Sequence, residues 1–182
     1  GKSSGRGGLV EIALPRDLSN DLRMLSSEEG TSLFTTLLTA FGVQMQKYSG
    51  EDDLNIGLPV AHRPHSKLEQ IFGMFVNTIV VRLKYQEEDT FRDLIKRTNE
   101  AALSSISHQD VSFETVVETV KQERILNANP LFQVAFAWQN NLNQPLGLDG
   151  IKSEVIKGIE RPSIFDITLY LWDNGDIIEG EI

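Results

Sequence analysis

The sequence has no cysteine among its 182 residues, which excludes disulfides, thiol nucleophiles and cysteine metal ligands. It also lacks any run approaching the ~20 apolar residues of a membrane-spanning helix. No apolar segment follows the positively charged N-terminus, so a secretory signal is not predicted. Basic residues are outnumbered, since 17 Lys and Arg accompany 26 Asp and Glu for a formal net charge of −9. Nucleic acid and membranes are therefore not expected as partners, and a cytoplasmic location is expected.

The remaining composition is that of an ordinary folded protein. Hydrophobic residues make up 40% of the chain and charged residues 24%, enough for one domain or one large subdomain with a core. Residues 1–8, rich in glycine and serine, predict a flexible lead-in, and residues 9–182 predict the folded unit. Because the last strand candidate runs into Ile182, we expect residues 9–182 to be a truncated unit.

Helical spacing of apolar residues, together with residues that begin and end helices, predicts four helices. They are Asp17–Glu29, with Leu18, Leu22 and Leu25 on one face; Phe34–Tyr48, capped by Thr31 or Ser32 and closed by Gly50; Thr90–Ser107; and a short helix after Ser112 with Phe113, Val116, Val117 and Val120 facing inward. Seven strands are predicted at Leu9–Leu14, Leu54–Val60, Met74–Tyr85, Leu131–Trp138, Ile151–Ile156, Ile164–Leu171 and Ile177–Ile182.

The interleaving of helices and strands predicts an α/β (α+β) sandwich, in which a mixed sheet is flanked by helices. We expect Phe34–Tyr48 and Phe91–Ile106 on the same side of the sheet. The Met74–Tyr85 segment is mostly apolar on both faces, which predicts an interior strand covered on both sides. Asn77 in its middle then needs hydrogen-bond partners.

The residue types alone reveal no active site. His62 and His65 are separated by Pro64, which breaks the helix that a histidine pair would need, so no metal site is predicted. His108, near a helix C-terminus, favours a structural role. No Gly-x-Ser-x-Gly elbow occurs, and Gly1-Lys2-Ser3 lacks the earlier glycine and preceding strand of a phosphate loop.

Four stretches nevertheless follow a known order and spacing. They are Tyr48-Ser49-Gly50 with Asp53, Gly57, Pro59, Ala61 and Arg63; Ile71-Phe72-Gly73-Met74-Phe75-Val76-Asn77-Thr78; His108-Gln109-Asp110 with Phe113-Glu114 and Val117-Glu118; and Arg124 with Asn129-Pro130-Leu131-Phe132-Gln133. A fifth, weaker stretch is Phe165-Asp166-Ile167-Thr168-Leu169. These stretches resemble the later core motifs of the condensation domains of nonribosomal peptide synthetases, and together they cover Leu9 to Leu171.

The sequence departs from the family pattern at three points. Phe72 is inserted before a motif glycine, Ser112 replaces a usual proline, and Ile125 replaces a usual aspartate. The form Phe75-Val76-Asn77-Thr78 argues against the epimerisation and cyclisation relatives.

The resemblance implies one lobe of a two-lobed fold like that of chloramphenicol acetyltransferase, with the reaction centre in a tunnel between the lobes. The family's H-H-x-x-x-D-G motif lies in the first lobe, and this sequence has no adjacent histidines. The resemblance therefore implies the C-terminal lobe, with no catalytic residue of its own and no activity alone. Such domains join a carrier-bound acyl or peptidyl thioester to the amine of a carrier-bound amino acid.

Site residues follow from the same resemblance. Phe75, Asn77, Thr78 and Ser163 are expected at the substrate tunnel, with Ser163 on the acceptor side. Phe75 and Trp138 are more often core residues than parts of a substrate wall, and a structural role with satisfied hydrogen bonds is an equal alternative for Asn77. Arg63 and Asp166 are expected at the lobe interface, where Arg63 would pair with the aspartate of the missing motif. In the family, the stretch that includes His108 positions the helix that follows.

The implied partners are the N-terminal lobe, donor and acceptor carrier domains and an adenylation domain. No cofactor is expected to bind directly, because the substrates are carried on the phosphopantetheine of the carriers. Two alternatives stay open at this point: a carrier-binding or scaffold module without chemistry, and another acyltransferase of the same superfold.

Overall fold

The computed structural model describes residues 7–61, 63, 66–68, 70–120, 129–139, 150–151 and 163–182. Its helices are α1 (Arg16–Glu28), α2 (Leu33–Ser49), α3 (Phe91–Ser107) and α4 (Phe113–Val120), with a short 3-10 turn at Ser66–Leu68. Its strands are β1 (Glu11–Ala13), β2 (Asp53–Ala61), β3 (Val76–Lys84), β4 (Val134–Trp138), β5 (Ile167–Asp173) and β6 (Ile178–Glu181). None of the helices in these ranges is long and apolar enough to cross a membrane.

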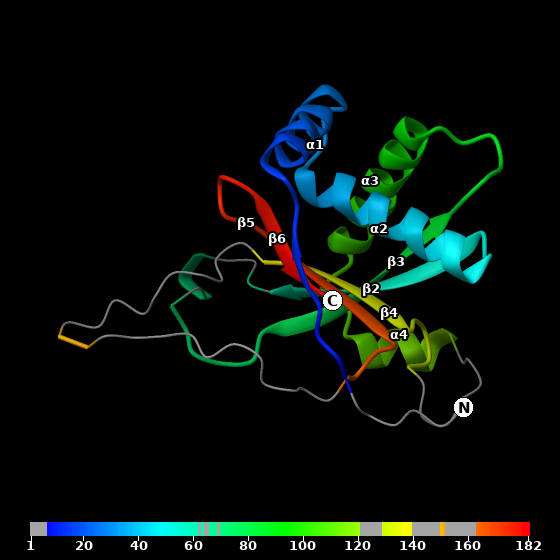
Figure 1. Ribbon diagram of the computed structural model, residues 1–182. Helices are drawn as coiled ribbons and strands as arrows, with labels where there is room; N and C mark the ends of the chain where they lie inside the picture. Colours follow the sequence, from blue (N-terminus) through cyan, green and yellow to red (C-terminus); the bar gives the residue numbers. More distant parts are fainter. Residues whose placement is uncertain are drawn as a thin grey trace.

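The six strands form one mixed sheet in the order β1-β6-β5-β4-β2-β3. Strand β4 pairs in parallel with β2 and β5, whereas the other neighbours are antiparallel. Helices α1, α2 and α3 lie on one face of the sheet and α4 lies on the other (Figure 1). The predicted mixed sheet flanked by helices is therefore confirmed, including the placement of the two long helices on one side.

Capping residues set the ends of the two long helices. The Ser32 hydroxyl accepts a hydrogen bond from the Thr35 amide at 3.2 Å, and Gly50 ends α2 with a φ of 72°. Helix α3 begins with a capping box between Thr90 and Asp93. The sequence prediction of these ends is confirmed, with Ser32 as the cap of α2.

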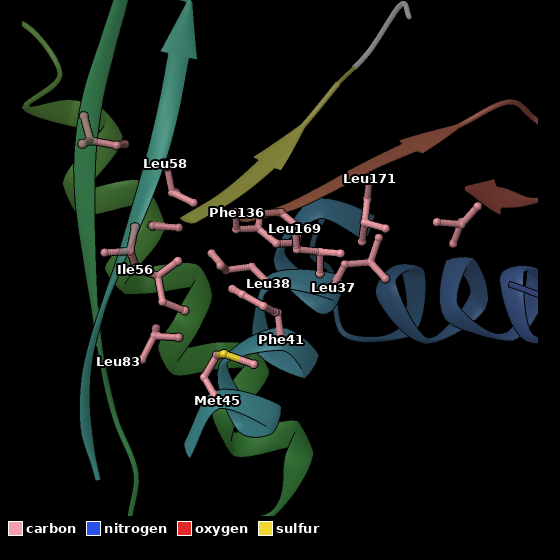
Figure 2. Packing of buried hydrophobic residues seen from close by; sticks show 14 residues of the cluster. Leu37, Leu38, Phe41, Met45, Ile56, Leu58, Leu83, Phe136, Leu169 and Leu171 are labelled. Atoms are coloured by element: carbon pink, nitrogen blue, oxygen red, sulfur yellow. The ribbon is translucent and has the colours of Figure 1, made fainter. Parts of the chain in front are cut away.

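The main core lies between the sheet and the helices α2 and α3. Figure 2 shows side chains of α2 pointing toward the strands β2, β3, β4 and β5. The buried members labelled there are Leu37, Leu38, Phe41, Met45, Ile56, Leu58, Leu83, Phe136, Leu169 and Leu171. The ring of Phe136, only 1% exposed, packs against Phe34 and Phe41 at centroid distances of 5.7 and 5.9 Å.

Strand β3 lies at the edge of the described sheet, so the prediction of an interior strand is wrong. Its apolar pattern arises because α3 covers Ile79 and Val81 on one face, not because strands flank it on both sides. Side chains take the place of a neighbouring strand. Ser105 donates to the Val80 carbonyl and Arg97 to the Lys84 carbonyl, each at 3.0 Å. Satisfying edge groups in this way discourages pairing with another chain.

Helices α1 and α4 bury their predicted faces only in part. On α1, Leu18 is 44% exposed and the buried positions are Ser19 and Ser26. The Ser26 hydroxyl bonds that of Thr36 at 2.7 Å, so α1 meets α2 through small polar residues. On α4 the predicted inward residues Phe113, Val116 and Val117 are half-buried, whereas Val120 is 57% exposed and no residue of the helix is fully buried.

Some predicted elements lie beyond what the structure describes. Of the strand predicted at Ile151–Ile156, only Ile151 falls within the described residues, where it forms a single bridge. Residues 1–6 of the predicted lead-in also lie outside the described ranges.

An ion pair fastens α1 to the β5–β6 hairpin. Arg23 donates two hydrogen bonds to Asp173, at 2.6 and 3.0 Å, with each side chain 26% exposed. The hydrogen bonds from Arg23 hold the pKa of Asp173 below its ordinary value, and the amide of Gly175 acts in the same direction. A carboxyl whose pKa is lowered by folding stabilises the fold above its unfolded pKa, and that stability is lost as the pH falls through the folded value.

We predict that Asp173→Asn lowers the free energy of unfolding at pH 7 by about 1 kcal/mol. The difference from the parent chain should shrink as the pH falls below the unfolded pKa of about 3.9 toward the lower folded value. Urea unfolding between pH 7 and pH 3 measures it. Asp176→Asn is the matched control, because Asp176 pairs with Arg16 where both side chains are more than half exposed. An equal cost for both variants, or a cost that does not change with pH, would contradict the assignment.

Candidate functional site

A groove of about 420 Å³ opens beside the start of β3. One wall is formed by residues that enter and begin β3, and the other by the turn between α3 and α4 and the first turn of α4. The lining residues are Met74, Phe75, Val76, Asn77, Thr78, Gln109, Asp110, Ser112, Phe113 and Glu114. Each wall thus belongs to a different motif stretch. Asn77 on one wall and Ser112 on the other are 35 residues apart in the sequence but line the same groove.

Phe75 forms part of this groove and is held in place by Arg63. The Arg63 guanidinium lies over the Phe75 ring, 4.1 Å from its centroid, which is a cation–π geometry. It also donates hydrogen bonds to the main-chain carbonyls of Leu68 and Ile71, the second at 3.0 Å. Among the described residues no carboxylate pairs with Arg63. Arg63 therefore organises the approach to β3 and orients Phe75.

The Asn77 amide bridges the two walls of the groove. Its Nδ2 donates to the carbonyls of Gln109 at 2.7 Å and Val111 at 2.9 Å, and its Oδ1 accepts from the amide of Thr78 at 2.9 Å. The need for partners, expected from the sequence, is met by main chain from the α3–α4 turn. Thr78 follows on the groove wall and is half-buried.

The structure does not bring Ser163 and Asp166 to the groove. Both are exposed and lie before β5. The Ser163 hydroxyl donates to the Phe165 carbonyl, and the Asp166 amide donates to the Gln133 carbonyl at 2.9 Å. Trp138, the other aromatic residue weighed from the sequence, packs against the main core.

An aromatic cluster on the α4 face of the sheet supports the groove from behind. The Phe132 ring, 1% exposed, contacts the rings of Phe113 and Phe165 at centroid distances of 5.7 and 4.9 Å. A Cβ atom on Gly57 would come within 2.2 Å of the Phe132 ring. Residues of the first, third, fourth and fifth motif stretches therefore meet in one cluster. Phe113 belongs both to this cluster and to the groove wall.

The histidine of the α3–α4 turn has an architectural environment. His108 caps the C-terminus of α3, and its Nδ1 lies 2.8 Å from the Ser104 carbonyl and 3.1 Å from the Ser107 hydroxyl. His62, His65 and Glu69 lie outside the described residues. Within the described ranges no group of three histidine, aspartate or glutamate side chains gathers as a metal site would require.

The lining of the groove combines polar and apolar side chains. Its lining contains two carboxylates, Asp110 and Glu114, together with the apolar side chains of Met74 and Phe75. The sequence alone predicts the stretch with Gln109, Ser112 and Glu114 only as a helix-positioning motif. This stretch lines the groove because α3 packs on β3 and brings the α3–α4 turn next to the start of that strand. No local sequence pattern predicts that packing.

A second, smaller cavity of about 280 Å³ lies between β3 and α3 and includes Tyr85, Leu94 and Ala101. The Tyr85 hydroxyl is buried with no hydrogen-bond partner among the described residues, and burial raises its pKa to about 12. It therefore stays protonated at neutral pH. None of the motif stretches lines this cavity, so the groove beside β3 remains the candidate site.

Comparison with known proteins places the chain among condensation domains. The family model described as "Condensation domain" matches residues 2–181. Malpinin synthetase of Mortierella alpina is 37% identical over 179 residues, which is 98% of this chain and 2% of that protein. Gramicidin S synthase 2 of Brevibacillus brevis is 38% identical over 154 residues, which is 85% of this chain and 4% of that protein. The chain thus spans a very small part of these relatives.

Solved structures share the fold. A four-domain nonribosomal peptide synthetase bound to AMP and glycine superposes with a TM-score of 0.85 at 26% identity, covering 99% of this chain and 15% of that one. The X-domain from teicoplanin biosynthesis superposes with a TM-score of 0.83 at 22% identity, covering 99% and 42%. The fold predicted from the motifs is confirmed.

The contact between Arg63 and Phe75 generates a test in a double-mutant cycle. We predict that Arg63→Met and Phe75→Leu are coupled by about 0.5–1 kcal/mol in the free energy of unfolding, since either change removes the cation–π contact. Urea unfolding of the parent, both single variants and the double variant measures the coupling. Arg82→Met is the control, because Arg82 pairs with Asp53 and is not the arginine that lies over the Phe75 ring. Equal coupling of Phe75 to both arginines would contradict the assignment.

Proposed function

This chain belongs to the condensation-domain family, and from that premise we propose that it is the C-terminal lobe of such a domain in a nonribosomal peptide synthetase. Residues 9–182 would form the lobe and residues 1–8 a lead-in. The observation that carries the proposal is the groove itself. Two motif stretches of the family build its walls, yet the sequence holds no adjacent histidines and therefore no H-H-x-x-x-D-G motif. One wall of a reaction site would then be present without its catalytic base.

The reaction of the complete domain would be amide formation between two carrier-bound substrates. The acceptor amine attacks the thioester carbonyl of the donor, the C–N bond forms and the C–S bond breaks. The proton lost by the amine leaves with the thiol. The chemistry requires that both substrates be held together, that the proton have a route, and that charge on the carbonyl oxygen be stabilised.

This lobe would contribute the binding of substrates and the fit between lobes. Phe75 and Thr78 would line the substrate tunnel, with Asn77 between them, and Ser163 would face the acceptor side from its own segment. Arg63 and Asp166 would lie at the interface with the first lobe. The Arg63 guanidinium is held by carbonyls and by Phe75, and an incoming aspartate of the first lobe would pair with it there.

The partners would be the N-terminal lobe of the same domain, donor and acceptor carrier domains and an adjacent adenylation domain. The phosphopantetheine arms of the carriers would deliver both substrates, so this lobe would need no cofactor of its own. The groove beside β3 supports this division, because its side chains can orient an acyl or aminoacyl group and include no histidine or lysine.

We predict that this chain alone forms no amide bond above the uncatalysed rate. The groove supplies one wall, whereas the base and much of the charge stabilisation are expected from the first lobe. The test incubates the chain with loaded donor and acceptor carriers and measures dipeptidyl thioester by intact-protein mass. The matched control is the same chain in one polypeptide with a first lobe that contains H-H-x-x-x-D-G.

Dipeptidyl product from the chain alone would contradict the proposal, and His108 would then be the first residue to substitute. Absence of product from the two-lobe control would instead favour a carrier-binding or scaffold module. Binding of a carrier to that inactive two-lobe protein, measured by calorimetry, would support such a module.

A further inference from the structure

We propose that Asn77 is a positioning residue, which fixes the two walls of the groove relative to each other and makes no contact with a substrate through its amide. The inference rests on the proposed function, which makes this groove a substrate wall. It selects the structural one of the two roles expected of Asn77 from the sequence, because the hydrogen bonds of the amide are directed into the protein.

The amide of Asn77 has no donor left for a ligand. An asparagine side chain carries two N–H donors and one carbonyl acceptor. Both donors are used by main-chain carbonyls, those of Gln109 at 2.7 Å and Val111 at 2.9 Å. Its oxygen accepts from the Thr78 amide at 2.9 Å, which determines which end of the side chain is oxygen.

The two carbonyls belong to the turn that joins α3 to α4. Carbonyl groups at and just beyond a helix C-terminus lack partners within the helix, so they need donors from elsewhere. The turn holds itself through only single main-chain bonds, such as the Val111 amide to the His108 carbonyl at 3.1 Å. A side chain from β3 that binds two carbonyls at once therefore sets where Ser112 and α4 begin relative to β3.

The same bonds set the groove. Gln109 and Ser112 line the wall opposite Met74 and Phe75, and Phe113 anchors the far side of that wall on Phe132. The α3–α4 turn is thus fixed at two points, by the hydrogen bonds from Asn77 (the Asn77 clamp) and by the contact of Phe113 with Phe132. The width of the groove is then determined by the protein before any substrate enters, which is the condition for a preorganised site.

Replacement by aspartate isolates this role. The carboxylate would place negative charge against the carbonyl oxygens of Gln109 and Val111, which accept hydrogen bonds and cannot donate them. The carboxyl group introduced by Asn77→Asp should therefore have a pKa above the ordinary value of about 3.9. Stability of the variant is then retained at low pH and lost as the pH rises through that raised pKa.

Asn99→Asp is the matched control. Asn99 is also half-buried, but its Oδ1 accepts hydrogen bonds from the hydroxyls of Thr31 and Thr35 at 2.9 and 3.3 Å. Those donors favour a carboxylate, so the pKa of the carboxyl introduced there should be at or below about 3.9.

Carbon-detected NMR titration of the 182-residue chain measures both carboxyl groups. We expect the introduced carboxyl group to have a raised pKa in Asn77→Asp and no raised pKa in Asn99→Asp. In Asn77→Asp the amide chemical shifts of Asp110 and Ser112 should follow the titration of that carboxyl group. A pKa at or below about 3.9 in Asn77→Asp overturns the proposal. So does a raised pKa without any response from Asp110 and Ser112.

Asn77→Ala keeps the proposal testable if the aspartate variant does not fold. Hydrogen exchange at the Val111 amide should accelerate at least about tenfold, while amides of α2 keep their rates. Unchanged exchange at Val111 overturns the proposal. These measurements use the chain without substrates, so a result against the Asn77 clamp would not contradict the proposed function. Absence of condensation by the two-lobe control would, in turn, not contradict the Asn77 clamp.

Discussion

The ring of Phe132 occupies the space beside Gly57 in which any other residue would place its Cβ atom. This contact requires glycine in the middle of β2, at a cost in strand propensity, because only a bare main chain lets an aromatic ring approach so closely. Phe113 and Phe165 pack on the same ring. Through these three rings the sheet is joined to the α3–α4 turn and to the start of β5, so the second face of the sheet acquires a core of its own.

The groove depends on this cluster and on the edge of the sheet. Phe113 leaves the cluster to form part of one groove wall, and β3, as the edge strand, leaves room for the α3–α4 turn to reach around its beginning. Side chains of Ser105 and Arg97 satisfy main-chain carbonyls along that edge. An open edge is usually a liability for aggregation. Here the edge strand presents motif residues to a groove instead of to a neighbouring strand.

Helices, strands and the family were predictable from the sequence, because capping residues such as Ser32 and Thr90 and the spacing of motif residues act locally. Strand order was not. The side chains of β3 point to the two faces of the sheet, so their apolar pattern predicts cover by another layer and does not show whether a strand pairs on each side of β3. The inward position predicted for Leu18 was wrong because Ser19 and Ser26 are the buried residues of α1. Hydrophobicity alone assigns such positions to leucine. The convergence of Asn77 on Gln109 and Val111 required the tertiary fold.

The central claim is that the motif residues act together through the contact between Gly57 and Phe132. The most direct measurement is the free energy of unfolding of Gly57→Ala in the parent chain and in a Phe132→Ala background, with Gly8→Ala, which has open space around it, as the control. We predict a loss of about 1–3 kcal/mol in the parent from overpacking, and little or no loss once the ring is removed. An equal loss in both backgrounds, or none in the parent, would contradict the account.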